Sequence, residues 1–96
     1  MIEEVRVVDG EILGIRDRVS PKGDELVELR VKRGAGYERC LAYAQKAAEL
    51  KRLLGKLADL ARGKGMTRVA DLRVRVEVSG IVKSRDFIVT GFRLVH

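Results

Sequence analysis

The chain has 96 residues, of which 46% are hydrophobic, 35% are charged and 4% are aromatic. This length predicts one domain with one modest core, and the composition excludes both a disordered chain and a membrane protein. Lysine and arginine together number 20 against 14 aspartates and glutamates, so the net charge is +6. A small basic domain favours a polyanionic partner, although a charge of this size also serves solubility.

Few residues are available for a zinc site or for nucleophilic catalysis that depends on histidine. Cys40 is the only cysteine and His96 the only histidine, which excludes an internal disulfide and argues against a structural zinc site or a Cys-His arrangement. No apolar run approaches the roughly 18 residues of a membrane helix, and no apolar signal region follows the acidic start Met1-Ile2-Glu3-Glu4. We therefore expect a cytoplasmic protein without a membrane partner.

The amide content is unusual. The chain has no asparagine and one glutamine, Gln45, while charged residues are abundant. This combination is typical of proteins from hot habitats, so an archaeal or thermophilic bacterial source is expected.

The first half of the chain predicts three strands. Residues 5–19 are rich in β-branched residues, and Gly10 and Gly14 indicate one long bent strand, with a hairpin at Asp9 and Gly10 as the alternative. Residues 20–24 and 34–36 are turn clusters on either side of a strand over 26–33. That strand alternates between two faces: Val27, Leu29 and Val31 on one, Glu28, Arg30 and Lys32 on the other.

Residues 37–43 predict a third, short strand, with Tyr37, Arg39, Leu41 and Tyr43 on one side and Glu38, Cys40 and Ala42 on the other. From residue 44 to 62 the hydrophobic period changes to that of a helix. The predicted helix face comprises Ala47, Leu50, Leu54, Leu57 and Ala61. Gly63 is the expected C-terminal cap, and residues 63–71 form a connector.

Two strands complete the pattern. Residues 72–78 alternate and continue to residue 83 after a bend at Gly80, residues 84–86 turn, and residues 87–95 form the last strand. The predicted order is β-β-β-α-β-β, an all-β domain with one helix.

This order resembles the oligonucleotide/oligosaccharide-binding superfamily, or OB-fold, in its replication protein A and tRNA-binding type. Residues 10–17 resemble its bent first strand, and residues 22–31 its first loop and second strand. Residues 47–54 resemble its barrel-plugging helix, and residues 74–82 its fourth strand. The resemblance covers nearly the whole chain and implies a five-stranded, partly open barrel as a single domain over residues 1–96.

The resemblance also implies a ligand site on the outer face of the second and third strands, between two loops. The corresponding nucleic-acid-binding residues are Arg16, Arg18, Lys22, Arg30, Lys32, Tyr37, Arg39, Tyr43, Lys83, Arg85 and Phe87. Cations follow phosphates, and flat aromatic or guanidinium groups stack on bases. The alternative is that the tyrosines close the barrel mouth and that each arginine is a solvated surface residue. Phe92 is expected in the core.

The helix carries a second candidate surface. Leu50, Leu53, Leu57 and Leu60 form a line that widens the apolar face, and such a surface favours a homo- or hetero-oligomer. The alternative is that the connector 63–71 folds over these leucines.

The sequence lacks a phosphate-cradling motif: Arg39 replaces the last glycine of a dinucleotide fingerprint after Gly34 and Gly36. We expect no enzyme activity and no cofactor. The predicted function is single-strand-preferring nucleic-acid binding, in archaeal DNA replication, DNA repair or RNA metabolism. The alternative is a non-catalytic accessory subunit that mediates protein interactions in a larger nucleoprotein complex.

Overall fold

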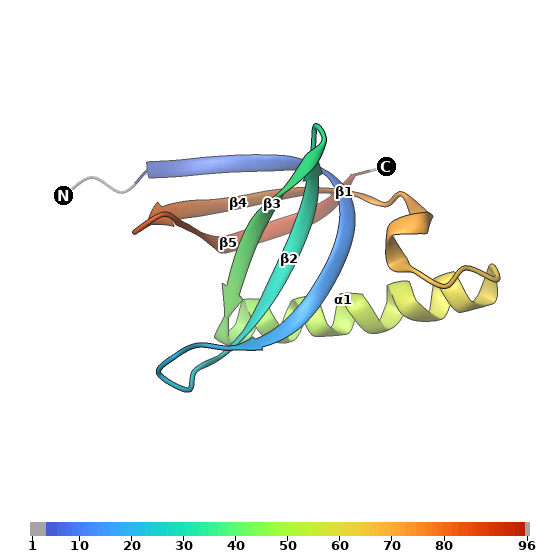
Figure 1. Cartoon of the computed structure of the whole chain (residues 1–96), viewed down its shortest axis with the longest axis horizontal. Helices are drawn as coiled ribbons and strands as arrows, with labels where there is room; N and C mark the ends of the chain where they lie inside the picture. Colours follow the sequence, from blue (N-terminus) through green and yellow to red (C-terminus); the bar gives the residue numbers. More distant parts are fainter. Residues whose placement is uncertain (1–3, 96) are drawn as a thin grey trace.

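The computed structural model describes residues 4–95. It has the predicted order β-β-β-α-β-β, with a short 3-10 helix before the fourth strand (Figure 1). The elements are β1 (Glu4–Val19), β2 (Glu25–Arg33), β3 (Gly36–Tyr43), α1 (Ala44–Gly63), the 3-10 helix Val69–Leu72, β4 (Arg75–Lys83) and β5 (Asp86–Val95).

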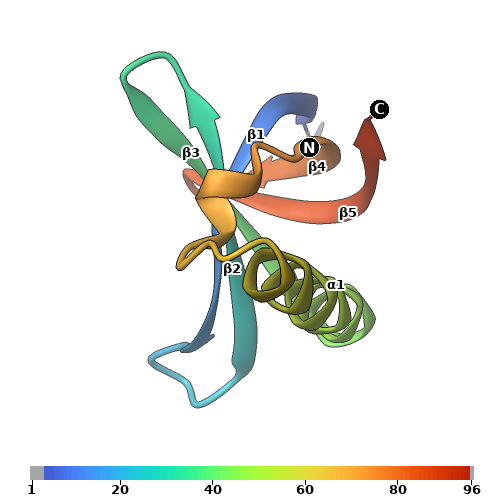
Figure 2. The same cartoon turned by 90° about the vertical axis from the view of Figure 1, so that its right-hand side faces the viewer.

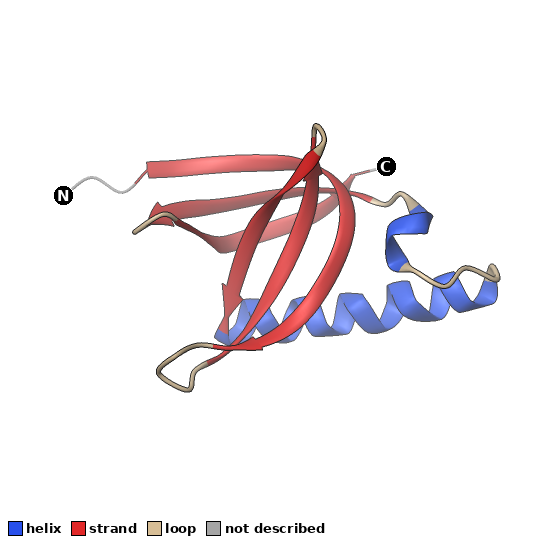
Figure 3. Ribbon diagram, in the orientation of Figure 1, coloured by secondary structure: helices blue, strands red, loops and turns tan. Residues whose placement is uncertain are grey.

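The five strands form a closed barrel in the order β1-β2-β3-β5-β4. Neighbouring strands are antiparallel except β3 and β5, whose parallel contact is short and pairs Cys40 with Phe87 and Leu41 with Ile88. The predicted five-stranded barrel class is thus confirmed, and this short contact is what closes the ring. The helix crosses below the barrel and continues beyond it (Figure 3).

The long first strand belongs to both halves of the barrel. Its first part pairs with β4 up to Glu11, and its second part pairs with β2 from Ile12 onward, with a bulge between Ile12 and Gly14. A Cβ atom at Gly10 would lie 2.5 Å from the Lys32 carbonyl oxygen, so only glycine permits β1 to pass this close to β2. The predicted single bent strand is confirmed, and the alternative hairpin at Asp9 and Gly10 is wrong.

The core fills the barrel between the strands and the helix. The inward faces predicted for the second and third strands are buried, including Val27, Leu29, Val31, Cys40 and Ala42. Burial raises the pKa of the Cys40 thiol to about 12, with a smaller contribution from Glu38. The single cysteine is therefore a neutral, apolar core residue.

Both ends of the helix differ from the usual pattern. It begins directly after β3 without a side-chain cap, and Ala44 has a left-handed φ of 51°. Gly63 was predicted as the C-terminal cap, but it is the last helical residue; Lys64 is the cap, and the left-handed glycine is Gly65 at φ 73°. The Met66 N–H donates to the Ala61 carbonyl at 2.8 Å and so ends the helix.

The fourth strand starts later than predicted. Leu72 belongs to the 3-10 helix, and Arg73 has a φ of 54°, which breaks the alternation before Arg75. The predicted bend at Gly80 is confirmed by a bulge between Ser79 and Gly80. The last strand begins at Asp86, one residue before the predicted start.

The line of leucines on the helix is mostly interior, which corrects the predicted partner surface. Leu50 and Leu57 are buried in the core, and Leu53 is partly buried against it. Only Leu60 is largely exposed, at 47%. The reason is that the barrel covers one side of the helix, while residues of the connector, among them Val69 and Leu72, pack against the same core.

Among residues 4–95, no helix combines the length and the apolar character needed to cross a membrane.

Candidate nucleic-acid interface

Strand register brings most of the predicted site residues onto one face. Arg16 of β1 lies opposite Glu28 of β2, and Arg30 of β2 lies opposite Arg39 of β3. Since opposite residues in an antiparallel pair point to the same side, these side chains share the outer face of the three strands. We call this surface the β1–β3 face; its further predicted members are Arg18, Lys32, Tyr37 and Tyr43.

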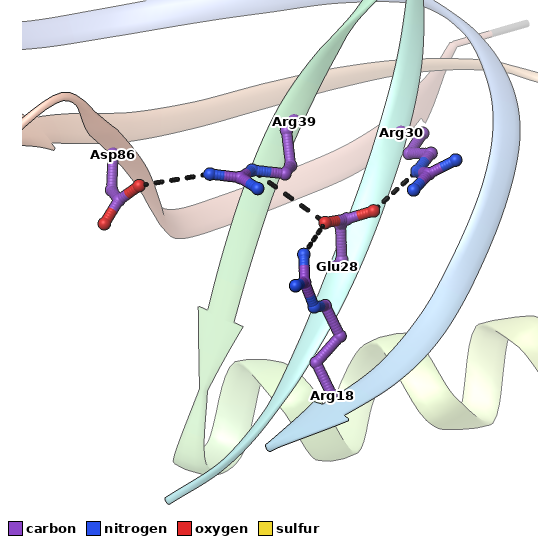
Figure 4. A network of polar contacts seen from close by, with 5 residues as sticks. All are labelled: Arg18, Glu28, Arg30, Arg39 and Asp86. Atoms are coloured by element: carbon purple, nitrogen blue, oxygen red, sulfur yellow. Dashed lines mark hydrogen bonds and ion pairs between the residues drawn. The ribbon is translucent and has the colours of Figure 1, made fainter. Parts of the chain in front are cut away.

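The centre of the β1–β3 face is a carboxylate, Glu28, whose side chain is fully buried although it lies on the outer side of the sheet. Arg18 Nη1 donates to Glu28 Oε1 at 2.6 Å, and Arg30 Nε donates to Glu28 Oε2 at 2.5 Å. Arg39 Nε lies 3.8 Å from Oε1, and its Nη2 lies 3.5 Å from Asp86 Oδ1 (Figure 4). One glutamate thus holds three arginines in place.

The arginines keep Glu28 ionised. Burial by itself would raise the pKa of this carboxyl group, but the hydrogen bonds from Arg30 and Arg18, together with their charges, lower the pKa below its usual value. A buried carboxylate is tolerated only with such charged donors. The arginine side chains themselves remain 30–49% exposed, so their outer donors stay accessible.

The β1–β3 face retains positive charge after these ion pairs are formed. Its cations are Arg16, Arg18, Arg30, Lys32 and Arg39, whereas the carboxylates that contact them are Glu28 and Asp86. Among the residues that the structure describes, Arg16 and Lys32 have no carboxylate within 4.0 Å. An anionic ligand would therefore meet cations that are not neutralised.

A flat, two-part surface lies beside these cations. The Arg30 guanidinium carbon is 4.7 Å from the centre of the Tyr37 ring, and Tyr37 is 48% exposed. These two side chains border a cleft of about 380 Å³ whose wall includes Gly14, Leu54 and Val69. Planar groups above an apolar wall suit a flat aromatic ligand.

The predicted loop residues lie at the ends of the barrel. Lys22 is exposed in the turn between β1 and β2, and Lys83 and Arg85 are exposed at the turn between β4 and β5. The contact between Arg39 and Asp86 links the β1–β3 face to this second turn. Tyr43 is 37% exposed and lines a small cleft with Arg39 and Asp86.

The sequence analysis predicted that Phe87 belongs to the nucleic-acid-binding site, and this prediction is wrong. It is buried in the core, and its ring lies against Gly80, where a Cβ atom would come within 2.8 Å of Phe87 Cζ. The inward direction follows from register, because Phe87 lies opposite the partly buried Val82. It therefore offers no surface for stacking. Phe92, expected in the core, is partly buried against it.

The sequence prediction omitted the two carboxylates that organise the face, Glu28 and Asp86. The sequence did contain a signal for Glu28, because this residue shares the outer face of its strand with Arg30 and Lys32. A single carboxylate among cations is expected to form ion pairs with several of them. No comparable signal marked Asp86, because its contact with Arg39 joins residues distant in sequence.

Among residues 4–95, no group of three or more histidine, cysteine, aspartate and glutamate side chains is arranged to hold a metal ion. The chain matches no protein-family model, and it matches no curated protein.

Proposed function

We propose that this protein binds single-stranded nucleic acid across the β1–β3 face, as a member of the OB-fold superfamily. The observation that carries the proposal is the cluster of four arginines and Lys32 from three strands, set beside the Arg30–Tyr37 pair. Cations contact phosphates, and the planar pair stacks on a base. A role in archaeal DNA replication, DNA repair or RNA metabolism belongs to the same proposal.

The stacking surface is the reason to propose a single strand. The bases of a duplex are stacked on one another and are not free to lie on Tyr37, whereas unpaired bases can be turned outward. Base stacking on an aromatic side chain contributes roughly 1–3 kcal/mol per base. A single strand therefore gains both from the cations and from the ring, and a duplex gains mainly from the cations.

Glu28 fixes the direction of the arginines before the ligand arrives. Three flexible cationic side chains would otherwise lose rotamer freedom on binding, which costs about 0.5–1.5 kcal/mol for each side chain. Because Glu28 is fully buried, a bound phosphate would contact the outer donors of Arg18, Arg30 and Arg39. The carboxylate thus reduces the total charge of the face while ordering it.

Salt dependence tests the proposal. We expect labelled single-stranded oligonucleotides to bind more tightly than duplexes, with log K falling against log salt at a slope of about −0.7 for each phosphate contact. Four contacts give a slope near −3. The absence of binding to every oligonucleotide at about 50 mM salt would contradict the proposal and leave the accessory-subunit alternative.

Two variants separate the charge contribution from the stacking contribution. Arg16→Ala removes a cation without a carboxylate partner and should flatten the slope by about 0.7 on all sequences alike. Tyr37→Ala should weaken binding by about 1–3 kcal/mol and leave the slope unchanged, because stacking releases no counterions. The matched control for Arg16→Ala is Arg52→Ala, which removes an exposed cation of α1; the same loss of slope in both variants would show that binding follows net charge and not this face.

A further inference from the structure

Gly14 leaves an open space on the β1–β3 face. It lies opposite Arg30 in the register of β1 and β2, and Arg16, two residues further along β1, lies opposite Glu28. A Cβ atom at Gly14 would meet no atom within 4 Å. Glycine within a strand is typical of a bulge or of a place where a ligand approaches the backbone closely. At Gly14 a bulge and an open space between two arginines occur together.

Gly14 lines the cleft of about 380 Å³ that Arg30 and Tyr37 border. The apolar walls of this cleft come from three elements, with Leu13 and Ile15 from β1, Leu54 from α1 and Val69 from the 3-10 helix. Small-molecule sites have volumes of about 300–1,000 Å³. The cleft is therefore large enough for a small flat ligand.

This cleft is separate from the groove that the resemblance to the OB-fold implies. The groove between the two turns contains a smaller cleft, lined by Pro21, Arg39 and Asp86 among others. None of these three residues borders the cleft at Gly14. Figure 2 shows the 3-10 helix in front of the strands, on the side of the barrel away from the β4–β5 turn. The cleft at Gly14 thus lies toward the helical side of the β1–β3 face.

A second cleft, of about 320 Å³, adjoins the first. All of its lining residues are charged, namely Arg16, Asp17, Arg18, Glu28 and Arg30. Arg16 and Arg30 line both clefts. The two clefts therefore form one continuous surface that is apolar at one end and charged at the other.

Both carboxylates of the charged cleft already have cationic partners. Glu28 contacts two of the arginines that line this cleft, and Asp17 Oδ1 lies 3.4 Å from Lys51 Nζ. Within residues 4–95, Arg16 has no carboxylate within 4.0 Å. The junction of the two clefts therefore holds a cation that an anionic ligand can pair with.

From these two joined clefts we propose that the helical side of the β1–β3 face binds one nucleotide, with its base over Gly14 and its phosphate at Arg16. A nucleotide matches the surface because a short sugar joins its flat base to its anionic phosphate. The base lies against the apolar side chains of Leu54 and Val69, beside the Arg30–Tyr37 pair. This binding mode rests on the proposed function, because the nucleotide belongs to a bound single strand. One base of the strand is thus turned into the cleft.

Fragments of a nucleotide test the two clefts separately. The probes are adenosine monophosphate, ribose phosphate and adenosine, and amide chemical shifts in NMR titrations report their binding. Ribose phosphate lacks the base and adenosine lacks the phosphate, so each should bind at least about tenfold more weakly than adenosine monophosphate. Arg16→Ala should weaken the binding of adenosine monophosphate about tenfold and leave that of adenosine within about twofold.

A steric variant tests the base cleft in the whole protein. Gly14→Leu places a side chain in the cleft and removes no charge, so it should weaken the binding of adenosine monophosphate more than about tenfold. A labelled single strand of adenine nucleotides should also bind about tenfold more weakly, with an unchanged salt slope, because the phosphate contacts remain. The matched control is Gly63→Leu at the exposed end of α1, where a Cβ atom also meets nothing within 4 Å. It should leave both affinities unchanged.

Equal affinities for adenosine monophosphate and ribose phosphate would overturn the proposal, as would equal effects of Gly14→Leu and Gly63→Leu. If Gly14→Leu fails to fold, the three fragments still decide. A Gly14→Leu protein that loses the mononucleotide but binds the single strand like the wild type would overturn it too, because the cleft would then take a free nucleotide. That result would leave the proposed function intact, whereas a wild-type protein that binds no oligonucleotide would contradict the proposed function itself.

Discussion

Two of the glutamate–arginine arrangements on the outside of the barrel differ in their surroundings. On the β1–β3 face, buried Glu28 contacts three arginines and leaves their outer donors free. On the β4–β5 side, Glu77 pairs with Arg93 directly opposite, with Nε–Oε1 at 3.0 Å and Nη2–Oε2 at 3.3 Å. The hydrogen bonds from Arg93 lower the pKa of Glu77.

The difference lies in burial and in stoichiometry. The Glu77–Arg93 pair is exposed and neutral, so it contributes little to stability and leaves no charge for a ligand. Glu28 is buried and contacts three arginines, so removing its carboxylate disturbs a connected network of polar contacts. Because the arginines outnumber this carboxylate, the face keeps a net positive charge. The same residue types therefore make a solvated surface in one place and a candidate site in the other.

The largest expected effect is a difference in stability between alanine variants of two glycines. Gly14 and Gly80 each lie at a bulge, one in β1 and one in β4. A Cβ atom at Gly80 would lie 2.3 Å from the Ile88 carbonyl oxygen, whereas no atom lies within 4 Å of the corresponding position at Gly14. Gly80→Ala should lower the free energy of unfolding by about 3 kcal/mol, and Gly14→Ala should leave it unchanged or raise it by up to about 1 kcal/mol. Urea denaturation measures both; similar losses for both variants would contradict the expected contrast.

A smaller loss is expected when the central carboxylate is neutralised. Glu28→Gln replaces charge-assisted hydrogen bonds by weaker ones and should lower the free energy of unfolding at pH 7 by about 2 kcal/mol. Glu77→Gln is the matched control and should change it far less, because that pair is exposed. Equal losses in urea denaturation would show that Glu28 is no more important than a surface residue.

The pH dependence of stability should follow from the same carboxylate. The folded-state pKa of Glu28 is lowered, so its contribution is complete above the unfolded-state pKa of about 4.3 and is lost as the pH falls through the folded-state value. The wild type should therefore lose more stability than Glu28→Gln between pH 5 and pH 3, in denaturation curves recorded across that range. Parallel curves for the two proteins would contradict this assignment.

The smallest effect is expected on the β4–β5 side. Arg93 is already neutralised by Glu77, so Arg93→Ala should leave the affinity for a single-stranded oligonucleotide and its salt slope unchanged. Arg16→Ala, on the β1–β3 face, should flatten the slope by about 0.7. A salt titration of both variants makes the comparison, and an equal change in slope would remove the distinction between the two faces.

The order of the elements was predictable because it depends on local periodicity. Alternation indicates strands at residues 26–33 and 37–43, and the change to the helical period after residue 43 locates the helix. The bends at Gly10 and Gly80 could also be predicted from the sequence, since glycine within a strand indicates a bulge or a close approach of another backbone. The end of the helix was harder to predict from the sequence. Gly63 and Gly65 are both compatible with a helix end, and only the hydrogen bonds in the structure distinguish them.

The sequence by itself thus determined the strand and helix order and the two faces of each strand, whereas the tertiary structure decided which groups are covered. Alternation distinguishes two faces of a strand but does not say how fully the outer face is covered. Glu28 lies on the outer face and is nevertheless fully buried, in contact with Arg18 and Arg30. The apolar face of a helix likewise does not reveal which of its residues the rest of the protein covers. In the structure Leu50 and Leu57 are interior, whereas Leu60 is exposed. Phe87 is interior because its strand pairs with β4 and β3, and the contact with β3 joins residues distant in sequence.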